Sequence, residues 1–114
     1  MKDRTMNYHS MQPWIHQILD LLEAHFGSSV EFVVHDLTLN YEHTIVDIRN
    51  GEITGRQIGD TGDILGLQVL RGTENNTDDN FYQNISFTKD GRTVRSSKLF
   101  FRDAQGNPTA CIAV

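Results

Sequence analysis

The sequence predicts an α+β domain: a five-stranded antiparallel sheet, short helices on one of its faces, and an amphipathic helix at the N-terminus. Three consecutive strand patterns occupy the last third of the chain, residues 81–114, and two more lie within residues 30–49. Helical patterns precede the first pair of strands and separate the two groups. Because βαβ units would alternate strands with helices, strands grouped on both sides of a helical middle favour α+β over a parallel sheet.

Length and composition indicate one globular domain. The 114 residues suffice to bury a core, and 38% of them are hydrophobic and 22% charged, as in ordinary soluble proteins. Ten basic against fifteen acidic residues, without a lysine or arginine cluster, argue against nucleic-acid binding by this chain alone. The single cysteine excludes an intrachain disulfide and fits a cytoplasmic protein. A polar N-terminus and acidic residues inside the longest apolar segment argue against a signal peptide or membrane span.

The first element we expect is a helix from Gln12 to Phe26, after a leader of residues 1–11, so that one domain spans residues 12–114. Pro13 suits the first turn, where no amide hydrogen is needed, and Gly27 suits the stop. Apolar residues recur every three or four positions and form one stripe: Trp14, Ile15, Ile18, Leu19, Leu22 and Phe26. The stripe packs either on the sheet or on a second subunit. The candidates for a homodimer interface are Trp14, Ile15, Ile18 and Leu22.

Two strands and a helical middle follow. Residues 30–37 are rich in β-branched and aromatic side chains, and residues 44–49 form a second strand that ends at the turn Asn50-Gly51. Asp60 or Thr61 caps a helix that runs to Leu70. Residues 73–80 contain no apolar side chain and form a solvated loop.

The last three strands are joined by glycine turns. In residues 81–89, Phe81, Ile85 and Phe87 alternate with polar residues, which predicts a half-buried strand. Asp90-Gly91 turns the chain into a strand over residues 93–102, and residues 103–107 turn it again with Gly106 in the left-handed conformation. The final strand, residues 109–114, carries the small side chains of Ala110, Cys111 and Ala113, which leave room against the sheet.

No motif indicates catalysis, a metal or a cofactor. His16 and His25 lie nine residues apart, which turns them to opposite sides of a helix, and no other histidine has a partner at ligand spacing. The lone Cys111 is expected to be a small buried hydrophobe. An acid–base pair of His35 and Asp36 has poor geometry, because neighbouring strand residues point to opposite faces.

Polar side chains that point to a buried sheet face either pair with the backbone or meet a ligand. The candidate ligand-binding residues are His35, Asp36, Tyr82, Ser96 and Ser97. Only one of His35 and Asp36 faces inward, and each candidate has a purely structural alternative, such as a bond from His35 to a loop carbonyl.

Four segments, in order, resemble the YheO-like PAS domain of bacterial transcriptional regulators. They are Val34-His-Asp-Leu37, Ile48-x-Asn-Gly-x-Ile-Thr-Gly-Arg-x-Ile-Gly59, Thr88-x-Asp-Gly-Arg-x-x-x-Ser-Ser97 and Ala110-Cys-Ile112. The resemblance implies a PAS-like fold and a sensor domain followed by a DNA-binding helix-turn-helix. It also adds motif residues that either shape the fold or touch a ligand: Asn50, Thr54, Gly55 and Arg56.

We therefore expect a non-enzymatic, homodimeric sensor domain that binds a small polar metabolite or mediates dimerisation. The chain ends at Val114 without a helix-turn-helix, so we expect an excised sensor domain that reaches DNA only through that missing part. One alternative is a pure dimerisation module whose pocket is filled by its own aromatic side chains, Phe81, Phe87, Phe100 and Phe101. The other is a small α+β enzyme that uses His35 and Asp36.

Overall fold

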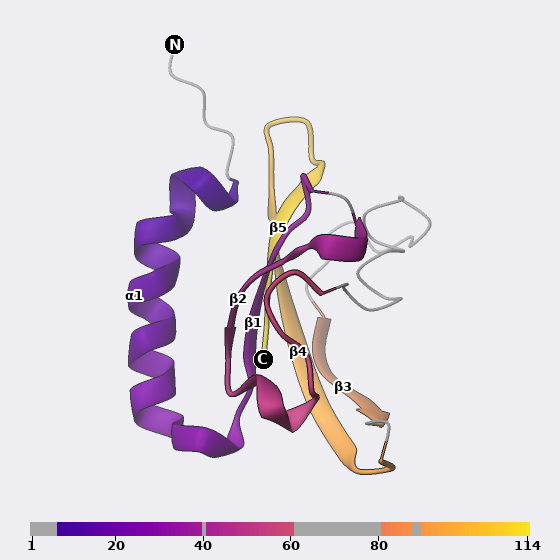
Figure 1. Cartoon of the computed structure of the whole chain (residues 1–114). Helices are drawn as coiled ribbons and strands as arrows, with labels where there is room; N and C mark the ends of the chain where they lie inside the picture. The colour runs from indigo at the N-terminus through magenta and orange to yellow at the C-terminus, as the bar shows by residue number, and fades with distance from the viewer. Residues whose placement is uncertain (1–6, 40, 61–80, 88–89) are drawn as a thin grey trace.

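A computed structural model describes residues 7–39, 41–60, 81–87 and 90–114 of the chain. Its five strands form one antiparallel sheet in the order β2-β1-β5-β4-β3, and helix α1 covers one face of it (Figure 1). The predicted α+β architecture with a five-stranded sheet is confirmed. The helix predicted from Asp60 to Leu70 and the loop predicted at residues 73–80 lie outside the described residues.

Helix α1, Tyr8–Phe26, begins before the predicted start at Gln12. Asn7 caps it: the Asn7 Oδ1 atom accepts a hydrogen bond from the Ser10 amide at 2.9 Å, and the Ser10 hydroxyl lies 3.2 Å from the Asn7 amide that donates to it. Pro13 therefore lies inside the helix and not in its first turn. Gly27 ends the helix as predicted, with a φ of 73° that disfavours other residues.

The strands follow the predicted pattern closely. They are β1 (Phe32–Asp36), β2 (Ile45–Arg49), β3 (Phe81–Phe87), β4 (Thr93–Arg102) and β5 (Pro108–Ala113). Short 3-10 helices occupy residues 27–29, 41–43 and 51–53. Strand β1 lies between β2 and β5, and all five of its residues are buried, which accounts for its apolar, β-branched sequence.

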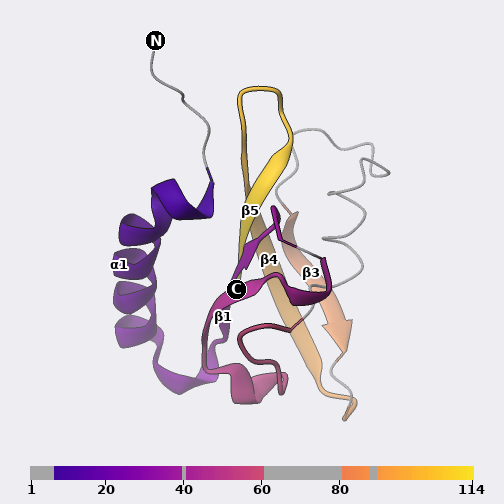
Figure 2. The same ribbon diagram turned by 45° about the horizontal axis from the view of Figure 1, so that its top comes forward.

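Strand β3 departs from the prediction. Gln83 has a φ of 58°, and the register with β4 shifts between Phe81 and Asn84, which breaks the expected alternation. Ile85 and Phe87 are 60% and 72% exposed, so the prediction of a half-buried strand is wrong for these two side chains. The reason is position: β3 is an edge strand, and α1 packs near β1 at the other side of the sheet (Figures 1 and 2).

The core lies on both faces of the sheet. Between α1 and the sheet, Ile15 and Leu19 pack with Phe32 and Val34 of β1. On the opposite face, Cys111 packs with Leu37 and Phe100 as the small buried residue that the sequence predicts. A third cluster consists of Val33, Ile45 and Ala113.

One flank of α1 is bound to strand β2 by charged groups. The Arg49 Nη1 atom donates to Asp20 at 2.8 Å and to Glu23 at 3.2 Å, and its Nε atom donates to Asp47 at 3.2 Å. These bonds, first that to Asp47 and then that to Asp20, raise the pKa of Arg49 and keep it charged. His16 lies 3.5 Å from the Asp47 carboxylate on the same flank. The position of α1 over the sheet is therefore fixed by apolar packing together with polar contacts to β2.

The packing of α1 makes a quantitative prediction. Replacing the fully buried Leu19 by Ala should lower the free energy of unfolding by about 2–5 kcal/mol, because it leaves a cavity between α1 and β1. Leu39→Ala, at an exposed loop position, should cost about 1 kcal/mol or less. Urea unfolding measures both changes. Equal losses at the two positions would contradict the described docking of α1.

Candidate functional site

A cavity of about 1050 Å³ lies on the sheet face opposite α1. Strand β1 supplies Val33 and His35 to its lining, β4 supplies Ser96 and Lys98, and β5 supplies Ala113. The chain on both sides of these strands supplies the walls: residues 29–31, 42–43, 53–56 and 59–60. The volume is sufficient for a small molecule.

Small residues on the central strand create this space. In the sheet register, Ala113 of β5 lies between Val33 of β1 and Lys98 of β4. Residues opposite each other in neighbouring strands point to the same face, so a methyl group separates two longer side chains at the floor of the cavity. The room that the sequence predicts beside Ala113 is therefore present on this face.

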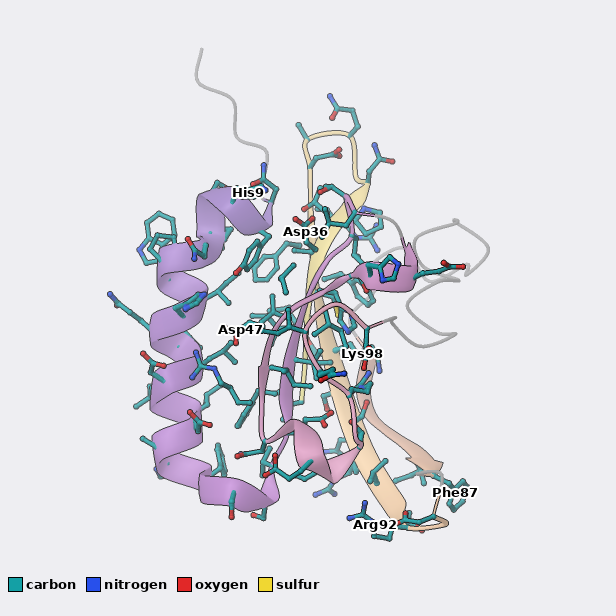
Figure 3. All side chains as sticks on the ribbon, in the orientation of Figure 1. His9, Asp36, Asp47, Phe87, Arg92 and Lys98 are labelled. Carbon is teal, nitrogen blue, oxygen red and sulfur yellow. The ribbon has the colours of Figure 1, made fainter. Side chains whose placement is uncertain are left out.

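Three polar groups lie on the floor. The imidazole of His35 is buried, and its Nδ1 atom shares a 2.9 Å hydrogen bond with the buried Thr44 hydroxyl. Lys98 is only 7% exposed, and its ammonium donates to the Ser96 hydroxyl at 3.2 Å. Figure 3 shows Lys98 on the sheet side away from α1, whereas Asp36 and Asp47 face the helix.

The wall that follows β2 is held by Glu31. Its carboxylate accepts hydrogen bonds from the Thr54 hydroxyl at 2.6 Å and from the Arg56 Nη2 atom at 2.8 Å. The Arg56 Nε atom also donates to the Thr54 hydroxyl at 3.1 Å. The Glu31 side chain is 9% exposed, so this is a largely buried ion pair with satisfied partners.

Asn50 joins the same wall to the end of α1. It has a φ of 59°, and its side-chain amide donates to the carbonyl oxygens of Gly27 at 2.9 Å and Val30 at 2.7 Å. Gly51 follows because a Cβ atom there would lie 2.5 Å from the Arg56 carbonyl oxygen. Asn50 does not line the cavity, whereas Thr54, Gly55 and Arg56 do.

The structure divides the five predicted ligand-binding candidates. His35 and Ser96 line the cavity. Asp36 faces α1, where its carboxylate accepts bonds from the Thr38 amide and hydroxyl and lies 4.0 Å from His9. Ser97 and Tyr82 do not line the cavity: the Ser97 hydroxyl accepts a bond from the Gln83 amide, and Tyr82 is exposed. The expectation that only one of His35 and Asp36 faces inward holds in the structure.

Among the lining residues that the sequence analysis does not single out are Lys98 and Glu31. The signal for Lys98 is its spacing, because it lies two positions after Ser96 in a strand and so shares its face. Lysine is seldom buried, which hides this signal. Glu31 precedes its strand directly and has no such periodicity.

Other kinds of site receive no support from the described part of the chain. Within it, no three histidine, cysteine, aspartate or glutamate side chains gather as metal ligands. None of its helices has the length and apolar character needed to cross a membrane.

Comparison with known protein families gives one match. The model of one protein family, described as the YheO-like PAS domain, matches residues 6–114. No curated protein matches the chain.

Two solved structures that superpose on this one belong to light-sensing proteins. One is the dark structure of the blue-light photoreceptor Aureochrome1 LOV, with 20% identity over 82% of this chain and 79% of that one and a TM-score of 0.48. The other is an RNA-binding Light-Oxygen-Voltage receptor, with 19% identity and a TM-score of 0.47. That match covers 99% of this chain and 34% of the receptor, so the chain spans about a third of the receptor's length.

The wall held by Glu31 can be tested by paired substitutions. Glu31→Gln should lower the free energy of unfolding by about 1–3 kcal/mol, because the partly buried Arg56 loses its charge partner. Asp90→Asn removes an exposed partner of Arg92 and should change stability by about 0.5 kcal/mol or less. Chemical denaturation at neutral pH measures both. A Glu31 variant as stable as the Asp90 variant would show that the Glu31–Arg56 pair does not hold the wall.

Proposed function

The chain belongs to the YheO-like PAS domain family, a family of sensory and regulatory domains, and from this membership we propose that it is the sensor of a bacterial transcriptional regulator. In this proposal it binds a small polar metabolite in the cytoplasm, works as a homodimer and catalyses no reaction. DNA is contacted by a helix-turn-helix domain of the same regulator. The predicted PAS-like fold and family are confirmed by the match over residues 6–114.

The observation that carries the proposal is the cavity on the sheet face opposite α1. A sheet face that only stabilises the fold would be filled by apolar side chains. Here the floor combines the methyl group of Ala113 with the buried polar groups of His35 and Lys98 and the half-buried hydroxyl of Ser96. Apolar space with a few converging polar groups is the usual character of a small-molecule site.

The alternative of a pure dimerisation module requires aromatic side chains in the cavity. Phe100 packs with Leu37 and Cys111, and Phe101 packs against the core beneath α1. Phe87 touches the cavity but is 72% exposed. The side chain of Phe81, the fourth aromatic residue of this alternative, lies outside the described part of the structure. The other three leave the floor of the cavity open, which supports ligand binding.

The alternative of an acid–base enzyme requires His35 and Asp36 to reach one substrate. The two side chains lie on opposite faces of β1, since His35 lines the cavity and Asp36 contacts residues on the α1 side. General acid–base catalysis needs both groups within hydrogen-bonding reach of the same reacting atoms. This separation supports a sensor over an enzyme of that kind.

For the homodimer, α1 offers an exposed apolar flank. Trp14, Ile18 and Leu21 are 60%, 48% and 67% exposed, and they lie on the flank away from the Arg49 contacts with β2. Ile15 and Leu22 instead pack against the chain's own sheet, so the interface we propose rests on Trp14 and Ile18 of the four predicted candidates, with Leu21 added.

The sheet continues this apolar surface on the same side. Leu99 of β4 pairs with Ile112 of β5, which packs against the core beneath α1, so Leu99 faces the helix side of the sheet and is partly exposed. A second copy of α1, laid over Leu99, would cover both surfaces. Exposed apolar patches of this kind mark interaction sites.

Ligand and dimer can be coupled through the wall. The wall residues Thr54 and Arg56 are bonded to Glu31, and Asn50 is bonded to the carbonyls of Gly27 and Val30, directly after α1. A ligand that prefers one position of this wall would therefore favour one position of α1. The ratio of two dimer arrangements would then change according to the ratio of the ligand's affinities for them.

The ligand half of the proposal is tested by native mass spectrometry of the freshly purified chain, followed by denaturing release of any bound molecule. We expect a dimer with one small molecule for each chain. Ala113→Leu should abolish ligand retention because its side chain fills the floor of the cavity, while Ala104→Leu, in an exposed turn, should retain the ligand. An empty dimer of the unsubstituted chain would favour the dimerisation module instead.

The dimer half is tested by placing a charge on the apolar flank. Ile18→Glu should weaken self-association by about tenfold or more, since it brings a carboxylate into an apolar interface. Gln105→Glu, in the exposed turn between β4 and β5, adds the same charge away from α1 and should leave association nearly unchanged. Sedimentation velocity over a range of concentrations measures the dissociation constants. Equal constants for the two variants would rule out the Trp14–Ile18–Leu21 surface.

A further inference from the structure

Part of the helix-side face of the sheet is left uncovered. Helix α1 lies over β1 and is bound to β2, so the part of β4 and β3 farther from the helix stays open (Figures 1 and 2). Arg95 lies four positions before Leu99 in β4, on the same face, and Ile85 of β3 pairs with Arg95. All three side chains are exposed. We call these three residues the open half-face.

Arg95 gives this open half-face its charge. It borders the cavity because it precedes Ser96 in β4, but alternation along the strand turns its side chain to the helix side, away from Ser96 and Lys98. Among the described residues, none forms a hydrogen bond or ion pair with the Arg95 guanidinium. The sequences of β3 and β4 contain no acidic residue. The open half-face is therefore an apolar surface with one cation and no anion of its own.

Helix α1 has the complementary character. At about 100° per residue, Trp14 and Leu21 lie on the side of α1 opposite the buried Leu19. The helix contains no lysine or arginine, and at the rim of its outer side the Asp20 side chain is 70% exposed, although it accepts a hydrogen bond from Arg49. A carboxylate has room for several donors, so Asp20 can bind a second cation.

We propose that each α1 of the homodimer lies between two sheets, with its inner side on its own sheet and its outer side on the open half-face of the partner. The outer side of each helix then covers the partner's Leu99 and Ile85. Ile18, on the flank, meets the same residue of the second helix, and Asp20 pairs with the partner's Arg95. This inference rests on the proposed homodimer and gives the arrangement of its two chains.

Charge favours this arrangement over the direct pairing of two open half-faces. Face to face, two copies of Arg95 would share an apolar interface that holds no acid, and like charges brought together in an interface weaken association. With α1 as the occupant, each guanidinium meets a carboxylate. A two-fold axis makes the same contact twice in the dimer.

Reciprocal charge reversal tests the pairing. Arg95→Glu and Asp20→Lys should each weaken self-association by about tenfold or more, because each brings like charges together at two places in the dimer. In an equal mixture of the two variants, the heterodimer regains two contacts between opposite charges. Native mass spectrometry in about 0.15 M ammonium acetate, which screens distant charges, should therefore show heterodimer well above the half that random pairing gives.

The matched control moves the same charges to another place. Gln105→Glu and Gln105→Lys lie in the exposed turn between β4 and β5, and their mixture should pair at random. Since Asp20→Lys also removes a partner of Arg49, a second measurement leaves Asp20 unchanged. In Arg95→Lys, a carbodiimide, which joins an ammonium group to a carboxylate with loss of water, should link position 95 to Asp20 between the chains of a dimer mixed from ¹⁴N and ¹⁵N protein.

The outcomes separate this arrangement from the homodimer itself. Random pairing of two folded charge-reversal variants would overturn the arrangement and leave the homodimer standing. The absence of a link from position 95 to Asp20 of the other chain would do the same. No self-association of the unsubstituted chain would contradict both the arrangement and the proposed homodimer.

Discussion

The pairing of the last strand in the middle of the sheet is the constraint on which the rest of the structure depends. Strand β5 joins β1 on one side and β4 on the other, so residues 33 and 98 become neighbours only through residue 113. Without β5, the β1–β2 pair and the β3–β4 pair would share no hydrogen-bonded edge. The same strand must also carry a small side chain where it meets the cavity, because Ala113 leaves the space between Val33 and Lys98. Fold and site thus depend on one short segment with small side chains.

Much of this architecture could be predicted from the sequence, because strand alternation and turn glycines act locally. The β4 strand, the turns at Gly91 and Gly106 and the helix stop at Gly27 follow from such patterns. The early start of α1 was also readable in principle, since Asn7 and Ser10 have the spacing of a capping box. The features that the sequence could not predict depend on which strands pair with each other and in which register. Only the order and register of the strands decide that β3 is an edge with exposed apolar residues and that Lys98 lies beside the methyl group of Ala113.

Strand β1 divides the molecule into two chemical environments. Its neighbours His35 and Asp36 point to opposite faces, one to the cavity and one to the groups around α1. On the helix side, Asp47 and Arg49 of β2 bind the polar flank of α1, and burial together with the carboxylates of Asp47 and Asp36 raises the pKa of Tyr8. That face therefore holds α1, while the other face keeps its polar groups beside open space.

These two environments meet in residues 27–31, which follow α1 and lead into β1. Gly27 and Val30 accept hydrogen bonds from Asn50, and Glu31 holds the wall through Thr54 and Arg56. A displacement of the wall must therefore move this segment or break charged hydrogen bonds, and a displacement of α1 meets the same restriction from the other side. Coupling between two binding events is reciprocal. If a ligand in the cavity changes the affinity of one chain for another, dimer formation changes the affinity for the ligand by the same factor, which makes dimer concentration part of the response of such a sensor.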